Sequence, residues 1–147
     1  MQSEEIDKLV GALLKAQKEI EHPKKNKKNP HFKNTYADLT AVIDAVIPVF
    51  NKHGLVVTQT VDSTLDYNLE SETPCLTTQI THTSGQWLSG SSAIPVDKKG
   101  PQAFGSGLTY MRRYTLSAIA GVASEDDDDA EGATDREKKT TKKKEDW

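Results

Sequence analysis

Residues 101–121, PQAFGSGLTYMRRYTLSAIAG, contain the pattern around which the rest of the chain is organised. Proline near the first position and glycine at the last are usual helix boundaries, so the stretch predicts one long α-helix from about Pro101 to Ala120 that ends at Gly121. On a helical wheel its apolar residues form one stripe. The residues predicted to face the core are Phe104, Leu108, Met111, Thr115, Ala118, Ile119 and Val122.

The polar residues of this helix gather on the opposite side of the wheel. They are Gln102, Ser106, Tyr110, Arg113 and Ser117, with Tyr114 beside Tyr110. Arg113 is therefore predicted to be exposed, where a guanidinium can bind a phosphate through two hydrogen bonds. A tyrosine one turn away can stack on a base. Arg112 falls at the edge of the apolar stripe, which favours pairing with an acid of the core or of a neighbouring subunit.

Two glycines, Gly105 and Gly107, stand in one turn of the same helix. Each costs about 1 kcal/mol of helix stability relative to alanine. One explanation is the close approach of another backbone, from the sheet, a subunit or a nucleic acid. The other is tight packing of the helix on the sheet.

Three segments before the helix predict a small antiparallel sheet. Residues 55–61 (LVVTQTV) are rich in β-branched residues, and residues 76–82 (LTTQITH) alternate. After a TSGQ turn, residues 87–94 (WLSGSSAI) return, whereas residues 66–74 are predicted to be a loop. One face of the sheet is expected to be apolar and the other to carry Thr, Gln and Ser. The predicted fold class is α+β, with the long helix packed across a three-stranded antiparallel sheet (β-β-β-α).

Two amphipathic helices are predicted before the sheet. The first begins near Ser3 and is ended by Pro23, and its stripe faces either the core or a neighbouring subunit. The second opens with a capping box at residues 35–38 and stops near Gly54. Its apolar stripe consists of Leu39, Val42, Ile43, Val46, Ile47 and Phe50.

The most basic stretch lies between these two helices. Residues 22–36, HPKKNKKNPHFKNTY, contain five lysines and no acidic residue, and their prolines and asparagines predict a loop. The net charge of −3 hides this patch, because the chain from Ser124 onward holds ten acidic and six basic residues. Nucleic-acid binding depends on the local patch. The loop is thus a candidate DNA contact, although such a loop alone also suits a solvated surface.

Several functional classes find no support in the sequence. No apolar run approaches the ~18 residues of a membrane span, and the acidic start does not resemble a signal peptide. Cys75 is the only cysteine, the four histidines lack metal-ligand spacing, and there is no phosphate-binding loop or catalytic triad. The run Asp126–Asp129 lacks the spacing of a calcium loop. We therefore expect a soluble intracellular protein that is not an enzyme and needs no metal or other cofactor.

Two blocks resemble the ERF (essential recombination function) family of phage single-strand annealing proteins. The first is residues 36–55, YADLTAVIDAVIPVFNKHGL. The second is residues 102–130, QAFGSGLTYMRRYTLSAIAGVASEDDDDA, which is similar to the family's Gly-Ser-x-x-Thr-Tyr-x-x-Arg-Tyr-x-Leu helix and the acidic run after it. The resemblance spans about residues 5–130 and leaves the end of the chain outside it.

This resemblance implies a protein that binds single-stranded DNA, forms rings or helical arcs, and anneals complementary strands without nucleotide hydrolysis. It implies a bacteriophage protein in the bacterial cytoplasm, whose partners are single-stranded DNA, the annealed duplex intermediate and further copies of the chain. It also points to a phage exonuclease or a host single-strand-binding protein. Two alternatives stay open: a coating protein that does not anneal, and an adaptor that acts through its tail. The family's most typical positions fall on Gly105, Ser106, Thr109, Tyr110, Arg113 and Tyr114.

We expect residues 1–123 to form the domain for DNA binding, annealing and oligomerisation, and residues 124–147 to form a disordered charged tail. Arg113→Ala is expected to weaken DNA binding and to leave the fold intact. The DNA contacts are expected from the lysine-rich loop, the turn before the long helix, and the helix itself. They are Lys24, Lys25, Lys27, Lys28, Lys33, Tyr36, Lys98, Lys99, Gln102, Ser106, Tyr110, Arg112 and Arg113.

Overall fold

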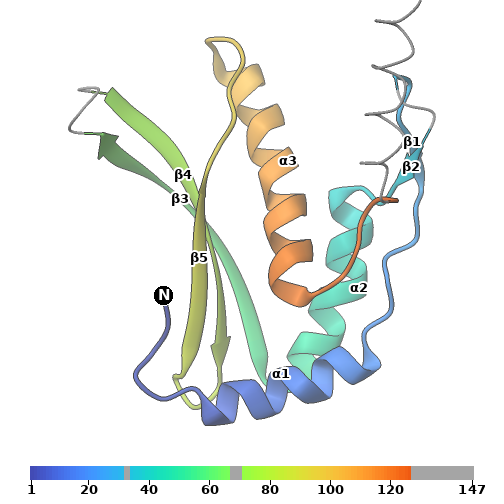
Figure 1. Ribbon diagram of the computed structural model, residues 1–147, viewed down its shortest axis with the longest axis vertical. Helices are drawn as coiled ribbons and strands as arrows, with labels where there is room; N and C mark the ends of the chain where they lie inside the picture. Colours follow the sequence, from blue (N-terminus) through green and yellow to red (C-terminus); the bar gives the residue numbers. More distant parts are fainter. Residues whose placement is uncertain (32–33, 67–70, 127–147) are drawn as a thin grey trace, which may run out of the picture.

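A three-stranded antiparallel sheet and three helices dominate the residues that the computed structural model describes, which are 1–31, 34–66 and 71–126 (Figure 1). This is the predicted α+β architecture. The elements, in chain order, are α1 (Asp7–Glu19), β1 (Lys27–Lys28), β2 (Thr35–Tyr36), α2 (Leu39–Lys52), β3 (Leu55–Asp66), β4 (Ser71–His82), β5 (Trp87–Ala93) and α3 (Pro101–Ala120).

The sheet has the strand order β3-β4-β5, with both pairs antiparallel. The ladder between β3 and β4 runs from Leu55 opposite His82 to Asp66 opposite Ser71. The predicted loop over residues 66–74 is therefore wrong in its second half, because β4 begins at Ser71. The polar composition of this part hid a strand whose pairing continues beyond the end of β5. The two strands form an arm that projects past the rest of the sheet (Figure 1).

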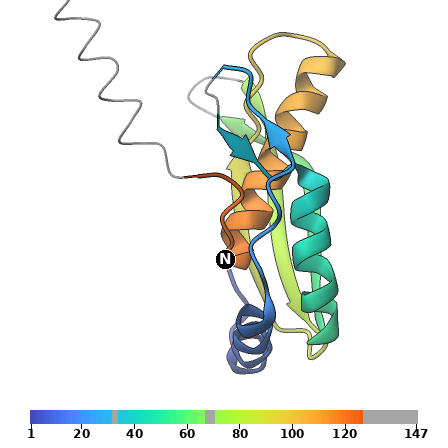
Figure 2. The same ribbon diagram turned by 90° about the vertical axis from the view of Figure 1, so that its right-hand side faces the viewer.

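Helix α3 crosses one face of the sheet, and α2 packs beside α3 and also against β3 (Figures 1 and 2). Helix α1 lies across the end of α2 and also contacts β4. Apolar side chains from all these elements meet in one core, which stabilises the layers by removing apolar area from water. The largest fully buried apolar side chains are Phe50, Leu9, Leu55, Leu76, Ile80, Leu116, Val42 and Val46.

Helix α3 is covered on two sides, and this corrects the prediction of which of its residues face solvent. Arg113 and Ser117, which the wheel placed toward solvent, are only 8% and 5% exposed. Ala118, predicted to face the core, is exposed. The wheel assumes one buried side, whereas α3 packs on the sheet and on α2. Ser117 tolerates burial because its hydroxyl donates to the carbonyl of Arg113 at 2.8 Å.

The first residues of the chain extend the sheet instead of beginning a helix. Residues 1–3 run along β5, with Ser89 N–H donating to Met1 O at 2.8 Å and Ser3 N–H donating to Trp87 O at 2.9 Å. Helix α1 therefore begins at Asp7 and not near Ser3. The free backbone groups of an edge strand take up a neighbouring segment readily, and here the chain's own N-terminus occupies part of that edge.

The start of α1 is capped from a distant turn. The side-chain oxygen of Gln86 accepts from the N–H groups of Lys8 and Leu9 at 2.9 and 3.0 Å, and its amide donates to Asp7 Oδ1 at 2.8 Å. These bonds satisfy backbone donors that a helix start leaves unpaired. The apolar stripe of α1 is divided. Leu9 is buried, whereas Val10 and Leu14 are about half exposed at 47% and 53%.

The lysine-rich stretch is not only a loop, because it contains a small antiparallel hairpin. Lys27 pairs with Tyr36 and Lys28 pairs with Thr35. The predicted capping box is wrong for the same reason, since Thr35 belongs to strand β2 and cannot cap α2. The N-cap is Asp38, whose carboxylate accepts from Ala41 N–H at 2.9 Å. This hairpin lies at the end of α2 away from α1 (Figure 1).

The two glycines of α3 have different surroundings. A Cβ at Gly107 would lie 2.1 Å from the carbonyl oxygen of Pro95, in the connection after β5, whereas a Cβ at Gly105 would meet no described atom within 4 Å. Close backbone approach thus explains Gly107, and the partner is the chain itself. Gly121 ends the helix with φ +73°, as predicted, because this conformation is unstrained only for glycine.

We predict that Gly107→Ala lowers the free energy of unfolding by about 1–3 kcal/mol, because either the helix or the backbone at Pro95 must move. Gly105→Ala is the matched control two residues away. It is expected to raise the free energy by up to about 1 kcal/mol through helix propensity. Urea unfolding followed by circular dichroism measures both. Equal effects of the two substitutions would contradict this account of Gly107.

Candidate nucleic-acid interface

Arg113 stands at the centre of a cluster of tyrosines. Its guanidinium carbon lies 4.5 Å from the ring centroid of Tyr36, 4.8 Å from that of Tyr114 and 5.7 Å from that of Tyr110. Such distances allow cation–π attraction, which strengthens when water is excluded. Tyr36 comes from β2 and the other three residues from α3. The cluster therefore joins the hairpin to the long helix.

The charge of Arg113 is balanced by Glu125, just after α3. Arg113 Nη2 donates to Glu125 Oε1 at 2.9 Å, and Arg113 Nη1 donates to the carbonyl of Ala37 at 3.5 Å. The hydroxyl of Tyr114 donates to the same Glu125 oxygen. Burial raises the pKa of Tyr114, and the hydrogen bond to Glu125 raises it further. Tyr114 therefore stays a protonated donor well into the alkaline range.

The two arginines have partners that differ from those the sequence predicts. Arg112 was expected to pair with an acid. Within the described residues its side chain instead meets Gln59 of β3, with Nε donating to the amide oxygen at 3.2 Å. The amide nitrogen of Gln59 in turn donates to Arg112 O and to Thr115 Oγ1, both at 3.1 Å. Arg112 thus ties α3 to the sheet, and Arg113, predicted to be exposed, is the arginine with a carboxylate partner.

Three adjoining hollows follow α3 on the side of Arg113. The first is lined by Lys98, Ser106 and Tyr110, among others. The second shares Ser106 and Tyr110 with it and adds Gln102, Thr109, Tyr36 and Arg113. The third shares Tyr36, Tyr110 and Arg113 and reaches Asn29, Asn34, Tyr114 and Glu125. Because neighbouring hollows share residues, we treat them as one surface, the tyrosine–arginine groove.

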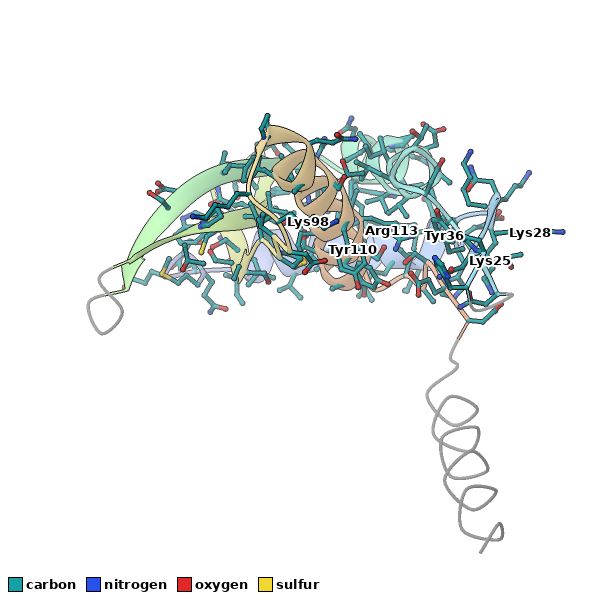
Figure 3. The ribbon with its side chains drawn as sticks, turned by 90° about the horizontal axis from the view of Figure 1, so that it is seen from above. Lys25, Lys28, Tyr36, Lys98, Tyr110 and Arg113 are labelled. Atoms are coloured by element: carbon teal, nitrogen blue, oxygen red, sulfur yellow. The ribbon has the colours of Figure 1, made fainter. Side chains whose placement is uncertain are left out.

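Lysines flank this groove at both ends. Figure 3 shows Lys98, Tyr110, Arg113, Tyr36, Lys25 and Lys28 in that order across the molecule. Lys98 and Lys99 lie in the exposed connection before α3, and Lys27 and Lys28 are exposed on β1. Positive charge on both sides of an aromatic centre suits a polyanion that passes along the groove.

Two other polar residues of the groove, Asp38 and Asn34, differ in how their side-chain oxygens are bonded. Asp38 lines the central hollow, and the hydrogen bond from Ala41 N–H holds the pKa of its carboxyl below the ordinary value. Its charge is therefore engaged at the start of α2. The side-chain oxygen of Asn34 is buried without a hydrogen-bond partner among the described residues.

The predicted contact residues that the structure describes form three sets: those that line the groove, those beside it and those that lie elsewhere. Lys25 and Lys28 lie beside the groove (Figure 3); Lys27 precedes Lys28 on β1, and Lys99 follows Lys98 in the connection before α3. Arg112 faces the sheet, Lys24 lines a different pocket, and Lys33 falls outside the described residues. The predicted residues that line the groove are Tyr36, Lys98, Gln102, Ser106, Tyr110 and Arg113.

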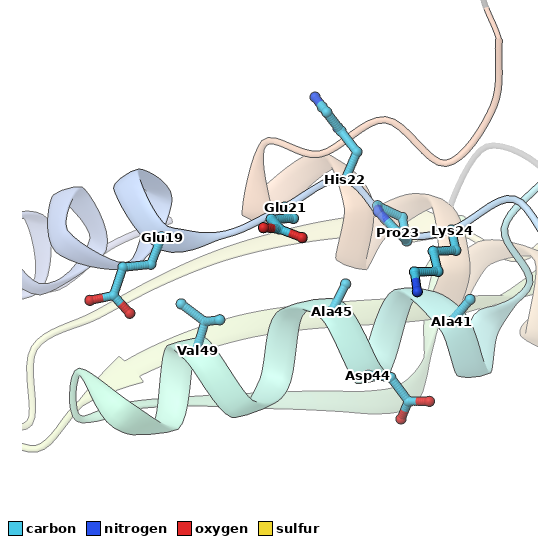
Figure 4. A pocket seen from close by; sticks show the side chains of 9 residues that line it. All are labelled: Glu19, Glu21, His22, Pro23, Lys24, Ala41, Asp44, Ala45 and Val49. Carbon is cyan, nitrogen blue, oxygen red and sulfur yellow. The ribbon is translucent and has the colours of Figure 1, made fainter.

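Lys24 lines a separate pocket between α2 and the segment that follows α1. Its neighbours there include three carboxylates, those of Glu19, Glu21 and Asp44. Figure 4 shows Lys24 and Asp44 toward one end of this pocket and Glu19 toward the other. Such an acidic lining disfavours a DNA backbone, so Lys24 is separated from the other lysines of its stretch by charge as well as position.

Sequence reasoning did not single out several residues that line the groove. They are Asn29, Asn34, Asp38, Thr109, Tyr114 and Glu125. Thr109 and Tyr114 carried a signal, since both are typical positions of the resembling family. Glu125 carried none, because its acidic neighbours made it look like part of a solvated tail. In the structure Ser124 is buried, and Glu125 forms an isolated bridge with Tyr36.

A comparison with protein families decides the relationship. The model of the ERF superfamily matches residues 9–146. The chain belongs to the ERF superfamily. The match continues past residue 130, where the resemblance was expected to end. Searches of curated proteins and of solved structures found no match.

ERF membership implies a role in recombination by single-strand annealing, and hence an interaction with single-stranded DNA. The described part of the ERF chain contains no helix that is long and apolar enough to cross a membrane. Within the same residues there is also no cluster of His, Cys, Asp or Glu that could hold a metal ion.

The burial of Arg113 revises the expectation that Arg113→Ala leaves the fold intact. We predict that this substitution lowers the free energy of unfolding by about 2–3 kcal/mol, less than for a fully buried pair because the side chain of Glu125 is 31% exposed. Lys98→Ala, on the exposed connection, is the control and should stay within about 0.5 kcal/mol of the parent. Urea unfolding measures both, and a parent-like Arg113→Ala would refute the structural role.

Proposed function

We propose that this ERF chain binds single-stranded DNA along the tyrosine–arginine groove and anneals complementary strands without nucleotide hydrolysis. Residues 1–123 carry binding and self-association in this proposal. The ligand is single-stranded DNA, followed by the annealed duplex, and further copies of the chain continue the groove as a ring or helical arc. The cellular setting is a bacterial host, with a phage exonuclease or a host single-strand-binding protein as a further partner.

The observation that supports this proposal most strongly is the exposed ring of Tyr110. It is 49% exposed, although it packs on the ring of Tyr114 with centroids 4.4 Å apart and planes at 41°. Its position is therefore held by a neighbour while much of its surface remains available. A base stacked on such a ring contributes about 1–3 kcal/mol. Phosphates on either side of that base would reach the lysines that flank the groove.

Annealing requires more than binding, since two polyanionic strands have to approach each other. Lysines that release counterions from one strand lower this repulsion. Stacking on one ring leaves the hydrogen-bonding edges of a base free to test a second strand. Continuation of the groove from subunit to subunit requires self-association. The half-exposed Val10 and Leu14 of α1 and the long edge strand β3 are surfaces that suit it.

A coating protein would use the same groove and differ only in the outcome. The exposed Tyr110 supports base stacking in both cases. The rate of strand pairing, and not the geometry of the groove, therefore distinguishes an annealing protein from a coating protein. The function of an adaptor that acts through its tail would instead not depend on DNA binding. No enzymatic role is proposed.

We predict that the protein accelerates pairing of two complementary oligonucleotides in the absence of nucleoside triphosphate. The assay follows quenching between fluorophores on the two strands, with a non-complementary pair as control. Acceleration that requires complementarity would support annealing. Tight binding to one strand without acceleration would favour the coating function, and a protein that binds neither strand would contradict both.

We also predict that Lys27→Gln with Lys28→Gln weakens binding to single-stranded DNA and flattens its dependence on salt. Each lost phosphate contact lowers the slope of log K against log[salt] by about 0.7 for a single strand. Lys8→Gln with Lys15→Gln is the matched control, because it removes the same charge from exposed positions of α1, away from the hairpin (Figure 1). Equal slopes for the two double variants would exclude the hairpin from the interface.

A further inference from the structure

A short acidic segment after α3 closes one end of the tyrosine–arginine groove. We call residues 124–126 the acidic strap. The carbonyl of Ser124 accepts from Ala37 N–H at 2.8 Å, and Glu125 bridges to Tyr36 in antiparallel fashion. The strap therefore lies beside β2. These backbone contacts place the side chain of Glu125 in the groove.

The carboxylate of Glu125 occupies the place where a phosphate of bound DNA would meet Arg113. It lines the same hollow as Arg113, Tyr110 and Tyr114. Two donors, Arg113 Nη2 and the Tyr114 hydroxyl, converge on its Oε1 atom. Paired donors of this kind, one cationic and one neutral, are suited to any oxyanion. Glu125 thus occupies a site whose two donors suit an oxyanion.

The next residue of the strap neutralises a second cation. Asp126 forms an ion pair with Lys25, which belongs to the predicted DNA-contacting lysines. Along the sequence, three further aspartates follow directly, at positions 127 to 129. The strap thus engages the buried arginine of the groove and a lysine beside it. A strand of DNA entering this end would compete with both carboxylates for the same donors.

We propose that the acidic strap is an internal competitor that occupies the Arg113 end of the groove until single-stranded DNA displaces it. This inference rests on the proposed function, because the displaced strap gives way to a phosphodiester. Displacement is physically accessible: the side chains of Glu125 and Asp126 are 31% and 56% exposed. Arg113, by contrast, is held among its three tyrosines and stays in place to receive the phosphate.

The strap acts as a threshold on binding. A DNA strand has to replace the two carboxylates of the strap with its own phosphates. A weak or short anion therefore gains little binding free energy. A long strand also binds the flanking lysines, and these contacts offset the free energy needed to displace the strap. The bound strand then has Arg113 and Lys25 as additional contacts. Removing the strap's charges should therefore raise affinity and make binding more sensitive to salt, because two further cations become available.

The test compares Glu125→Gln with Asp126→Asn against a matched double variant, Glu4→Gln with Glu5→Gln. Both remove two negative charges, and Glu4 and Glu5 are exposed near the start of α1, away from the groove (Figure 1). The probe is a fluorescent oligothymidylate titrated over a series of salt concentrations. We expect the strap variant to bind on the order of tenfold more tightly at low salt than the control, with a slope steeper by up to about 1.4.

The outcomes separate the strap from the function on which it rests. If the parent binds the oligonucleotide and the strap variant matches the control in affinity and slope, the strap is not a competitor and the proposed function stands. If none of the proteins binds, the proposed function fails, and the strap proposal fails with it. Urea unfolding of each variant monitors the fold. Because Asp126 is largely exposed, Asp126→Asn alone tests the proposal even where Glu125→Gln unfolds, and it should steepen the slope by about 0.7.

Discussion

The buried guanidinium of Arg113 is the constraint on which the groove depends. With its side chain only 10% exposed, the charge has to find partners inside the protein, because an isolated buried charge is very costly. It finds them in three segments: Tyr36 of β2, its own helix neighbours, and Glu125 beyond the helix. Pairing therefore holds the hairpin, α3 and the strap together. The same pairing fixes Arg113 in the tyrosine–arginine groove.

This arrangement joins stability to recognition. The tyrosines that cover Arg113 from water are also the rings on which a base stacks in the proposed function, and Tyr110 packs on Tyr114 while it remains 49% exposed. The lysines contribute differently, since Lys27, Lys28, Lys98 and Lys99 are exposed and cost little to desolvate. A rigid centre with solvated charges on both sides suits a ligand whose backbone repeats and whose bases vary.

Polar groups also determine how α3 sits on the sheet. Gln59 of β3 links Arg112 and Thr115 across the sheet face that is otherwise lined by Leu55, Leu76 and Ile80. Fully satisfied networks of this kind specify one orientation of a helix. The opposite flank of α3 is covered by α2, and here Ser117 and Arg113 are buried. A helical wheel that divides a helix into one exposed and one buried side cannot represent the contacts of α3 with both the sheet and α2.

By itself the sequence determined the three helices, the three main strands and their order: the strands by alternation, α2 and α3 by apolar periodicity, and the end of α3 by Gly121. It also determined the family, through motifs on α2 and α3. Only the tertiary structure decided which arginine meets a carboxylate, that Lys24 turns to an acidic pocket, and that Glu125 belongs to the groove. The physical reason is the range of the interactions. Periodicity reflects neighbours within a turn, whereas Arg113 reaches a carbonyl 76 residues away, and packing alone brings such groups together.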